Sequence, residues 1–425
     1  MPSEKREAEY WLYLEPYVHV SSNDHAVLFY NSLSGARFEI PASSRARDLV
    51  LELTDPVNGY VTRVTGTDLQ NPAVANLVNK IRKKFMGELL NTEWSAGKPV
   101  NIYPEAYFKS HLTRKMVETP GADDLIDLDN YIHEITIYLN SLGKTGPDPC
   151  PKAFRQFIFP GNTLEEDIDL PGDALKDLVV FLSRFKITML HISGADISRY
   201  PGFTAWPSLL SESGFTVTYH LRSDRYQAAT GSHILNQKGA RLAVHCSFPL
   251  DGDVFNFILN DLNDNSKIKQ TDIHFIITSS EELATARQII ALTGIPNAYL
   301  SPFFNGRNFD FFKETVFITR EDIRKSRPDR NQVFSRLSLN ETDFGKFIVL
   351  PDRHIYANPN DAPVGRFPED RVDSLILKEI LDGISWKRTR KSVSPCNRCL
   401  YHFLCPPVSS YELVMGRFNF CDVWK

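Results

Sequence analysis

Residues 241–294 read RLAVHCSFPLDGDVFNFILNDLNDNSKIKQTDIHFIITSSEELATARQIIALTG and contain the same unit twice. Each copy opens with a short apolar run, at 242–246 or 273–278, and continues into a segment with apolar residues at helical spacing. The second helical segment starts at Ser279 and has Glu282 three residues later, which is the spacing of a helix capping box. Repeated strand and helix units predict a parallel sheet with helices packed on it.

The same alternation extends in both directions along the centre of the chain. Further strand-like runs occur at 135–139, 187–192, 215–221 and 298–300, and further helical stretches at 173–185, 204–213, 226–238, 253–264 and 279–293. The predicted fold class is therefore α/β. Strands repeated in this way suit a partial (β/α)6 barrel, although periodicity alone does not distinguish this barrel from a doubly wound sheet.

The first 95 residues follow a different pattern. Strand-like runs at 18–20, 26–30, 37–40 and 60–64 are separated by turn residues, and helical segments follow at 44–53 and from Asn71 to Gly87. Asn71 and Pro72 are typical of a helix start, and the helix has apolar residues on one face up to Phe85. Strands followed by helices predict a separate α+β unit.

Length and composition limit the possible function classes. The chain has 425 residues, is 42% hydrophobic and 24% charged, and carries a net charge of −4. This composition is typical of a globular protein, and the charge provides no overall basic field for nucleic acid. The opening segment MPSEKREAEYWLYLEP lacks a signal-peptide pattern, and we read no transmembrane run of 18 apolar residues. We therefore expect a cytoplasmic protein with neither nucleic acid nor membrane as a partner.

Four of the six cysteines are clustered near the end of the chain. Cys396, Cys399 and Cys405 form a CxxCxxxxxC array, and Cys421 follows 16 residues later. In a reducing compartment such a cluster predicts a metal site, and four thiolates suit either zinc or an iron–sulfur cluster. Cys246 lies in an apolar run and is expected to be a core residue.

The segment ITIYLNSLGKTGPDPC at 135–150, followed by the helical units and the cysteine-rich tail, resembles a radical SAM domain followed by a SPASM domain. In radical SAM proteins a CxxxCxxC loop after the first strand holds the SAM-cleaving cluster. Gly143 and Pro147 stand at two of these positions, and only Cys150 remains. If the motif began at Cys150, Phe154 and Phe157 would fill its other positions. The resemblance therefore implies that this cluster is lost.

A second family motif is also altered. Radical SAM proteins have a Gly-Gly-Glu-Pro run after the second strand, where the backbone binds the amino end of SAM. Here the residues are Ser193, Gly194, Ala195 and Asp196, so one glycine persists and the pattern is broken. Both departures imply that SAM is neither bound nor cleaved, and we expect Asp196 to be a solvated loop acid.

The C-terminal region carries the SPASM part of the resemblance. FGKFIVLPDRHIYANPNDAPVGRF at 344–367 is similar to the small hairpin and loop of that domain. The resemblance implies one [4Fe–4S] cluster on the four clustered cysteines, with zinc as the alternative, because Ser409 stands where a second cluster would need a cysteine. His402 is expected to be exposed or to lie just outside the ligand set. The implied ligands are Cys396, Cys399, Cys405 and Cys421.

The N-terminal segment HAVLFYNSLSGARFEI resembles the winged-helix-like leader-recognition domain of peptide-modifying enzymes. That family binds the leader of a precursor peptide as an added strand at a sheet edge. The resemblance implies that the run at 37–40 accepts the peptide and that the helix from Asn71 forms the other wall; the plain alternative is a structural cap. The implied peptide-binding residues are Arg37, Phe38, Glu39 and Ile40.

These features predict four segments: a leader-recognition-like domain at 1–95, a linker at 96–130, a degenerate barrel at 131–335 and a SPASM-like iron–sulfur domain at 336–425. Nearly the whole chain resembles the pseudo-radical-SAM/SPASM proteins of maturation systems for peptides with double-glycine leaders. This resemblance implies a non-catalytic protein that binds a ribosomally made precursor peptide and scaffolds its modification by a separate radical SAM maturase. Two alternatives remain, a single-cluster electron carrier and a SAM-independent enzyme with a polar barrel pocket. The pocket would use four histidines near strand positions, His191, His220, His245 and His274.

Overall fold

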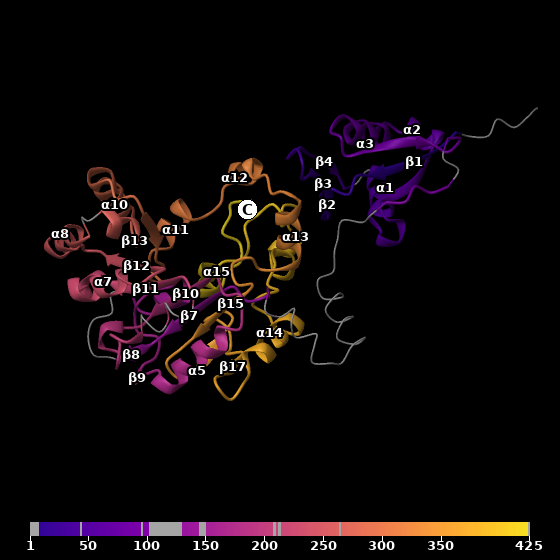
Figure 1. The fold of residues 1–425 in the computed structure, drawn as a ribbon. Helices are drawn as coiled ribbons and strands as arrows, with labels where there is room; N and C mark the ends of the chain where they lie inside the picture. Colours follow the sequence, from indigo (N-terminus) through magenta and orange to yellow (C-terminus); the bar gives the residue numbers. More distant parts are fainter. Residues whose placement is uncertain are drawn as a thin grey trace, which may run out of the picture.

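The computed structural model describes residues 8–42, 45–94, 97–101, 130–143, 150–206, 210, 214–262 and 265–423 (Figure 1). Most of the predicted linker at 96–130, most of the predicted helix at 204–213 and Pro147 lie outside these residues. Within the described ranges, none of the helices is both long enough and apolar enough to cross a membrane.

The N-terminal module contains two antiparallel sheets of three strands each in its described part. The first has the order β5–β1–β6 and the second β2–β3–β4. The predicted strands are present, whereas β1 and β6 were missed because their burial does not alternate along the strand. The strand bounds are Glu9–Leu14 (β1), Val18–Ser22 (β2), Ala26–Asn31 (β3), Arg37–Pro41 (β4), Val61–Thr65 (β5) and Gly87–Asn91 (β6).

Three helices cover these sheets: α1 (Arg45–Thr54), α2 (Gly66–Gln70) and α3 (Pro72–Lys83). The carboxamide oxygen of Asn71 accepts a hydrogen bond from the Ala73 amide, so Asn71 caps α3 as its sequence predicted. The prediction for Phe85 was wrong. The helix ends at Lys83, and Phe85 adopts φ +53° in the turn before β6 with 79% of its surface exposed.

The central sheet has nine strands in the described residues, in the order β14–β13–β12–β11–β10–β7–β15–β16–β17. The six predicted strands are all present and parallel, and they follow one another in chain order. A doubly wound sheet would reverse its order at a switch point, and these six strands show no reversal. The strands are β7 (Glu134–Tyr138), β10 (Met189–Ser193), β11 (Val217–Arg222), β12 (Ala240–Ser247), β13 (Thr271–Ile277) and β14 (Ala298–Pro302).

Helices connect these strands and bury one face of the sheet. Ser279 caps α10 by accepting a hydrogen bond from the Glu282 amide, as the capping-box spacing predicted. Alternate strand residues, such as Ile192 and Val244, pack with the helices in the largest apolar cluster. The other alternate residues therefore lie on the opposite, inner face. The helices that follow the strands are α5 (Gly172–Leu182), α7 (Ala228–Leu235), α8 (Gly252–Asp261), α9 (Asn265–Lys269), α10 (Ser280–Thr293) and α11 (Phe309–Thr315).

The predicted hairpin at 344–367 extends this sheet on its other side. Strand β15 (Lys346–Val349) is parallel to β7, and β16 (His354–Tyr356) and β17 (Gly365–Arg366) continue antiparallel. The fully buried Trp386 stacks on Phe347 with ring centroids 5.2 Å apart and so joins the C-terminal region to the sheet. The remaining elements are the pair β8 (Asn140–Leu142) and β9 (Asp167–Asp169), and the helices α12 (Arg320–Lys325), α13 (Arg330–Ser338), α14 (Val372–Leu381) and α15 (Ser410–Met415).

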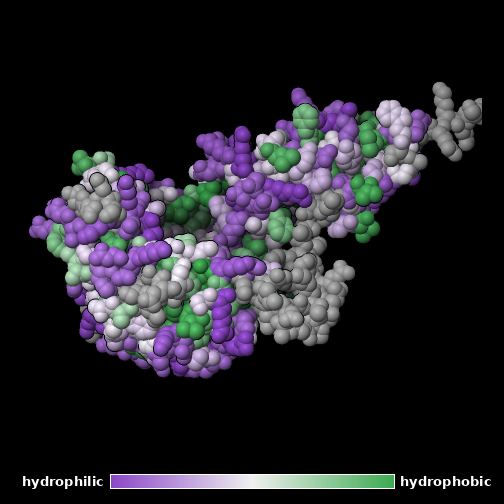
Figure 2. Space-filling model, viewed as in Figure 1, coloured by the Kyte–Doolittle hydropathy of each residue, from purple (hydrophilic) through white to green (hydrophobic). Residues whose placement is uncertain are grey.

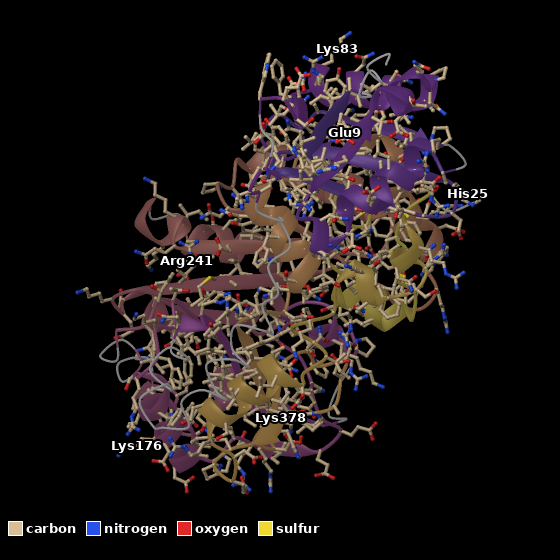
Figure 3. All side chains as sticks on the ribbon, turned by 90° about the vertical axis from the view of Figure 1, so that its right-hand side faces the viewer. Glu9, His25, Lys83, Lys176, Arg241 and Lys378 are labelled. Carbon is tan, nitrogen blue, oxygen red and sulfur yellow. The ribbon has the colours of Figure 1, made fainter. Side chains whose placement is uncertain are left out.

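Charged side chains lie on several of the described elements. Figure 3 shows Lys83, Lys176 and Lys378 on separate elements, at the end of α3, on α5 and on α14. Arg241 on β12 is neutralised by Asp272 at 2.8 Å.

Candidate functional site

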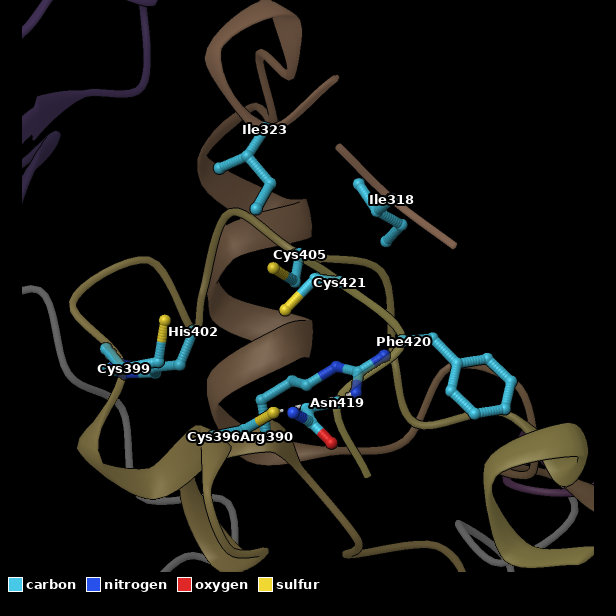
Figure 4. A pocket seen from close by; sticks show the side chains of 10 residues that line it. All are labelled: Ile318, Ile323, Arg390, Cys396, Cys399, His402, Cys405, Asn419, Phe420 and Cys421. Carbon is cyan, nitrogen blue, oxygen red and sulfur yellow. Dashed lines mark hydrogen bonds between the residues drawn. The ribbon is translucent and has the colours of Figure 1, made fainter. Parts of the chain in front are cut away.

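The fold brings the four clustered cysteines together around one cavity (Figure 4). Cys396 begins a short 3-10 helix and Cys399 caps it, Cys405 follows a turn, and Cys421 forms an isolated bridge with Ile318. Three of these cysteines are buried and Cys421 is partly exposed. Arg390 and His402 line the same cavity.

The two candidate occupants of this site differ in the thiolate spacing that they require. In the described residues, no three His, Cys, Asp or Glu side chains are grouped closely enough for a single metal ion. A tetrahedral zinc with Zn–S bonds of about 2.3 Å requires thiolates only about 3.8 Å apart. A four-iron cluster places its ligands at the corners of a larger core. Four thiols around a shared cavity are a ligand set that suits either a four-iron cluster or one zinc ion.

Hydrogen-bond donors contact two of these sulfur atoms. The Arg390 guanidinium donates to Cys396 Sγ at 3.8 Å, and the Tyr401 amide donates to Cys399 Sγ at 3.4 Å. Arg390 is itself buried and forms a bidentate pair with the carboxylate of Glu412. Such donors and a fixed positive charge stabilise thiolate ligands.

The protonation of the thiols follows from their burial. Burial raises the pKa of Cys396 to about 11, against the opposing effect of the nearby Arg390 charge. Burial likewise raises the pKa of Cys405 to about 12. Without metal, the Cys396 thiol donates a hydrogen bond to the Phe418 carbonyl at 2.9 Å. Metal binding at these cysteines must therefore release protons.

Two other residues that the sequence singled out also lie in this region. His402 is half-buried, and its Nδ1 lies 2.8 Å from the Cys399 carbonyl oxygen. Ser409 caps α15 in a reciprocal capping box with Glu412. The position at which a second cluster would require a cysteine is therefore a helix cap, and its partner Glu412 also holds Arg390.

The loop after the first barrel strand carries aromatic side chains in place of thiols. Phe154 packs edge-on against Tyr138 at 6.1 Å, and Phe157 packs against Phe159 at 6.1 Å. Cys150 lies in an apolar cluster with Phe159. The two positions that a shifted motif would assign to cysteines thus contribute rings to the interior.

The unshifted register of the motif also conflicts with the local backbone. Gly143 has φ +54°, and a Cβ atom there would lie 2.9 Å from the Glu165 carbonyl oxygen. A cysteine at this position would be strained in conformation and crowded. Pro147, the second position, is not among the described residues.

The altered glycine motif has a packing role. The prediction that Asp196 is solvated was wrong: it is 7% exposed and accepts hydrogen bonds from the Ser198 amide and hydroxyl. Its own carbonyl accepts a hydrogen bond from the Asn140 carboxamide. A Cβ on Gly194 would lie 2.5 Å from the Asn140 side-chain oxygen, so this glycine allows Asn140 to bridge two loops.

Strand β4 is an edge strand, and its register determines which groups face outward. In the described residues β4 pairs only with β3. The Ala42 amide donates to the His25 carbonyl, which identifies one hydrogen-bonded pair of the two strands. Hydrogen-bonded and non-hydrogen-bonded pairs alternate along an antiparallel ladder, so residues 38 and 40 also bond to β3. The backbone groups of residues 37 and 39 therefore point away from β3. The side chains of Phe38 and Ile40 are buried in the module core, and Arg37 and Glu39 point to the other face.

A groove of about 390 Å³ lies beside β4. Its far wall was predicted to be α3, but the groove is lined by α12 and by two segments that flank cysteines. Helix α3 contacts Phe38 instead, because the ammonium of its Lys80 lies 5.6 Å from the Phe38 ring centroid. The space-filling view shows a further hollow with apolar walls near α11 and α12 (Figure 2). The residues that line the groove are Arg37, Phe38, Glu39, Arg320, Ile323, Arg324, Tyr401 and Val423.

No protein-family model matches this sequence, and no curated protein matches it. Among solved structures, Streptococcus suis SuiB bound to S-adenosylmethionine is similar over 96% of this chain and 97% of that chain, with 12% identity and a TM-score of 0.50. The chain has a radical-SAM-like fold. A second SuiB structure, bound to the precursor peptide SuiA, covers 96% of this chain and 98% of that chain with a TM-score of 0.47 and 12% identity.

A row of histidines crosses the inner face of the sheet in this radical-SAM-like fold. Nδ1 of His191 lies 3.0 Å from Nε2 of His220, and Nδ1 of His220 lies 3.0 Å from Nε2 of His245. The His245 ring stacks on His274 at 4.8 Å. The sequence indicated the recurrence of these residues, but only the register of four neighbouring strands shows that they form one chain.

The hydrogen bonds and one nearby carboxylate assign the tautomers of this row. Nε2 of His191 lies 3.9 Å from the Glu134 carboxylate, which favours a proton on that nitrogen. His191 Nδ1 then accepts from His220 Nε2–H, and His220 Nδ1 accepts from His245 Nε2–H. Nδ1 of His245 is left as a buried acceptor without a partner in the described residues. In this assignment His191, His220 and His245 each carry one ring proton.

Proposed function

We propose that this chain is a non-catalytic, radical-SAM-like partner protein that binds a ribosomally made precursor peptide and presents it to a separate radical SAM maturase. The observation that carries this proposal is the free edge of β4 beside an open groove. An extended peptide would pair with the outward amides and carbonyls of Arg37 and Glu39 as a fourth strand of the sheet. SuiB has been crystallised with a precursor peptide, and the proposal assigns that class of ligand to this chain.

The proposal assigns no SAM chemistry to the barrel. It rests on the single remaining cysteine of the motif, on the aromatic packing of Phe154 and Phe157, and on the backbone of Gly143. In this proposal residues 1–95 are the leader-recognition domain, 131–335 the degenerate partial (β/α)6 barrel and 336–425 the SPASM-like domain. The sequential strand order supports the barrel assignment.

The proposed cofactor is one [4Fe–4S] cluster on the four clustered cysteines, with zinc as the alternative. The shared cavity and the hydrogen bonds donated to two of the sulfur atoms support it. When bound, such a cluster would cross-link two loops that otherwise contain only short helical turns. Arg390 would balance part of the negative charge of the ligands.

Metal content and SAM cleavage test this assignment. Anaerobically purified protein should contain about four irons and matching sulfide per chain, and it should form no 5′-deoxyadenosine from SAM. Serine at Cys399 and Cys405 should remove the iron, whereas Cys246→Ala should retain it because Cys246 lies in the sheet core. Cleavage of SAM, or about eight irons per chain, would contradict the proposal. A finding of one zinc and no iron per chain would rule out the iron–sulfur cluster, and the proposal of peptide binding would stand.

The histidine row supports a second candidate, an enzyme that does not use SAM. The row approaches a cavity of about 130 Å³ in which Glu134 pairs with Lys346 at 3.0 Å. Burial raises the pKa of Asp343 in the same cavity to about 7. These groups could exchange protons with a small polar substrate. Turnover that is lost in His220→Gln while peptide affinity is unchanged would favour this candidate.

A further inference from the structure

The cysteine loops form one wall of the peptide groove. Tyr401 lies two residues after Cys399, Val423 lies two residues after Cys421, and both line the groove beside β4. Ile323 of α12 lines this groove and the cysteine cavity alike. The two spaces are therefore separated by a single layer of side chains.

The first cysteine loop also holds the N-terminal module in place. The Asn23 carboxamide donates to the Arg398 carbonyl at 3.4 Å, and Ser21 Oγ lies 3.4 Å from Nδ1 of His402. The Tyr401 hydroxyl donates to the Glu39 carboxylate at 2.5 Å, directly on the edge strand. An apolar cluster spans the same contact and contains Leu28, Tyr30, Ile323, Val333, Leu400, Phe403, Leu404 and Cys405.

The backbone of this loop offers little rigidity of its own. Between Cys396 and Cys405 the described structure contains one three-residue 3-10 helix followed by turns, and no strand. Its shape therefore depends on side-chain contacts and on whatever its cysteines bind. A bound cluster would tie the loop to the segment around Cys421, which carries the second part of the groove wall.

The charges on the groove wall favour acidic side chains. Arg320 and Arg324 are exposed residues of α12 and line the groove. The other two charged lining residues are engaged with the protein: Arg37 donates to the Ile323 and Ser326 carbonyls, and Glu39 accepts from Tyr401. Side chains alternate between faces along an added strand, so every second residue of the peptide would face α12. Carboxylates at those positions would meet two guanidinium groups.

We propose that the peptide site is composite, formed by the β4 edge and by the wall of α12 and the two cysteine loops. It accepts an extended peptide with acidic residues at alternate positions, and it forms fully only when the four cysteines hold their cluster. Peptide affinity is thereby coupled to cluster loading. This inference rests on the peptide-binding function proposed above and adds the class of peptide and the regulation of the site.

The experiment uses two fluorescein-labelled probes, a dodecapeptide of alternating Glu and Val and its Gln and Val counterpart. Each is titrated by fluorescence anisotropy into the full chain with its cluster, into the same preparation after chelation, and into that preparation after reconstitution. The acidic probe should bind the loaded protein about tenfold more tightly than the neutral probe. Chelation should weaken the binding of the acidic probe about tenfold, and reconstitution should restore it.

Two variants distinguish the effect of the groove wall on peptide binding from the effect of the cluster. The double variant Arg320→Gln/Arg324→Gln should lose the preference for the acidic probe with its iron content unchanged. Tyr401→Ala should bind both probes more weakly, because it removes the side chain that contacts Glu39. Its iron content should be unchanged.

Three outcomes would overturn the inference. Equal affinity for the two probes would show that the site has no preference for acidic peptides. Equal affinity of the loaded and chelated protein would show that peptide binding is not coupled to cluster loading. In both cases a peptide still binds, so the proposed function stands. If neither probe binds the loaded protein, the composite site is wrong, and failure of the precursor peptide to bind the same sample would show that the proposed function is wrong as well.

Discussion

Replacing Arg390 with methionine is expected to destabilise the C-terminal region by about 3–5 kcal/mol, the usual cost of removing one partner of a buried ion pair. Glu412 is 0% exposed and Arg390 is 6% exposed, so the carboxylate would remain in the interior without its cation. The variant also removes donors to the Pro406, Pro407 and Phe418 carbonyls. Urea unfolding followed by tryptophan fluorescence measures the change.

A double variant is the matched control for this effect. Arg390→Met/Glu412→Leu removes both charges, and replacement of a buried pair by apolar residues is often neutral or stabilising. We expect it to recover most of the lost stability, although Ser409 also loses its capping partner. If Arg390→Met alone unfolds at the same urea concentration as the wild type, the pair does not stabilise this region.

Acidification is expected to destabilise the central sheet strongly. Burial holds the pKa of His220 and His245 well below 6.5, and burial also lowers the pKa of His191 and His274. The unfolded chain therefore binds more protons than the folded chain as pH falls below 6.5. Stability is fully present above that pH and declines below it, by up to about 1.4 kcal/mol per pH unit for each ring that stays neutral.

Other charged groups face this row, and the design of the experiment takes them into account. The Glu134 carboxylate partly opposes the effect of burial on the pKa of His191, and the Lys346 charge adds to that effect. Asp272 partly opposes the effect of burial on the pKa of His274. The central rings, His220 and His245, therefore give the cleanest test. Chemical denaturation at pH 7.5, 6.5 and 5.5 should show a steep loss of stability in the wild type and a shallower loss in His220→Gln. The exposed His25 supplies a control, His25→Gln, with the wild-type slope. Equal stability of the wild type at the three pH values would contradict the claim that the buried histidines stay neutral in the folded protein.

The sequence contained enough information for the main elements. The six parallel strands are largely apolar runs separated by segments with helical periodicity, and both features are local in the sequence. The capping residues Asn71 and Ser279 were likewise identified from their own neighbours. Strands β1 and β6 were missed because one face of each is not cleanly apolar, and Phe85 was misplaced because the chain turns two residues earlier than the apolar pattern ends.

The properties of the site that depend on distant contacts were not predictable. The spacing of the cysteines indicated a metal site, but it did not indicate that Tyr401 and Val423 line the groove beside β4. Asp196 was expected in solvent because nothing near it in the sequence reveals the cover provided by Asn140. The histidines recur visibly in the sequence, whereas their hydrogen bonds depend on a stepwise register between strands.

Peptide binding at the β4 edge is tested most directly by removing one outward amide. Proline at Glu39 deletes a backbone N–H that points away from β3, so the strand keeps its bonds to the sheet. It also removes the carboxylate that accepts from Tyr401, so its affinity is compared with that of Glu39→Ala, which loses the carboxylate and keeps the amide. Ser22→Pro is the matched control, because Ser22 lies on β2 at the opposite edge and by the same alternation points its amide outward. The measurement is the affinity of the full chain for the fluorescein-labelled dodecapeptide of alternating Glu and Val. Wild type and Ser22→Pro should bind alike, and Glu39→Pro should bind at least about tenfold more weakly; a Glu39→Pro protein with wild-type affinity would contradict binding of the peptide at this edge.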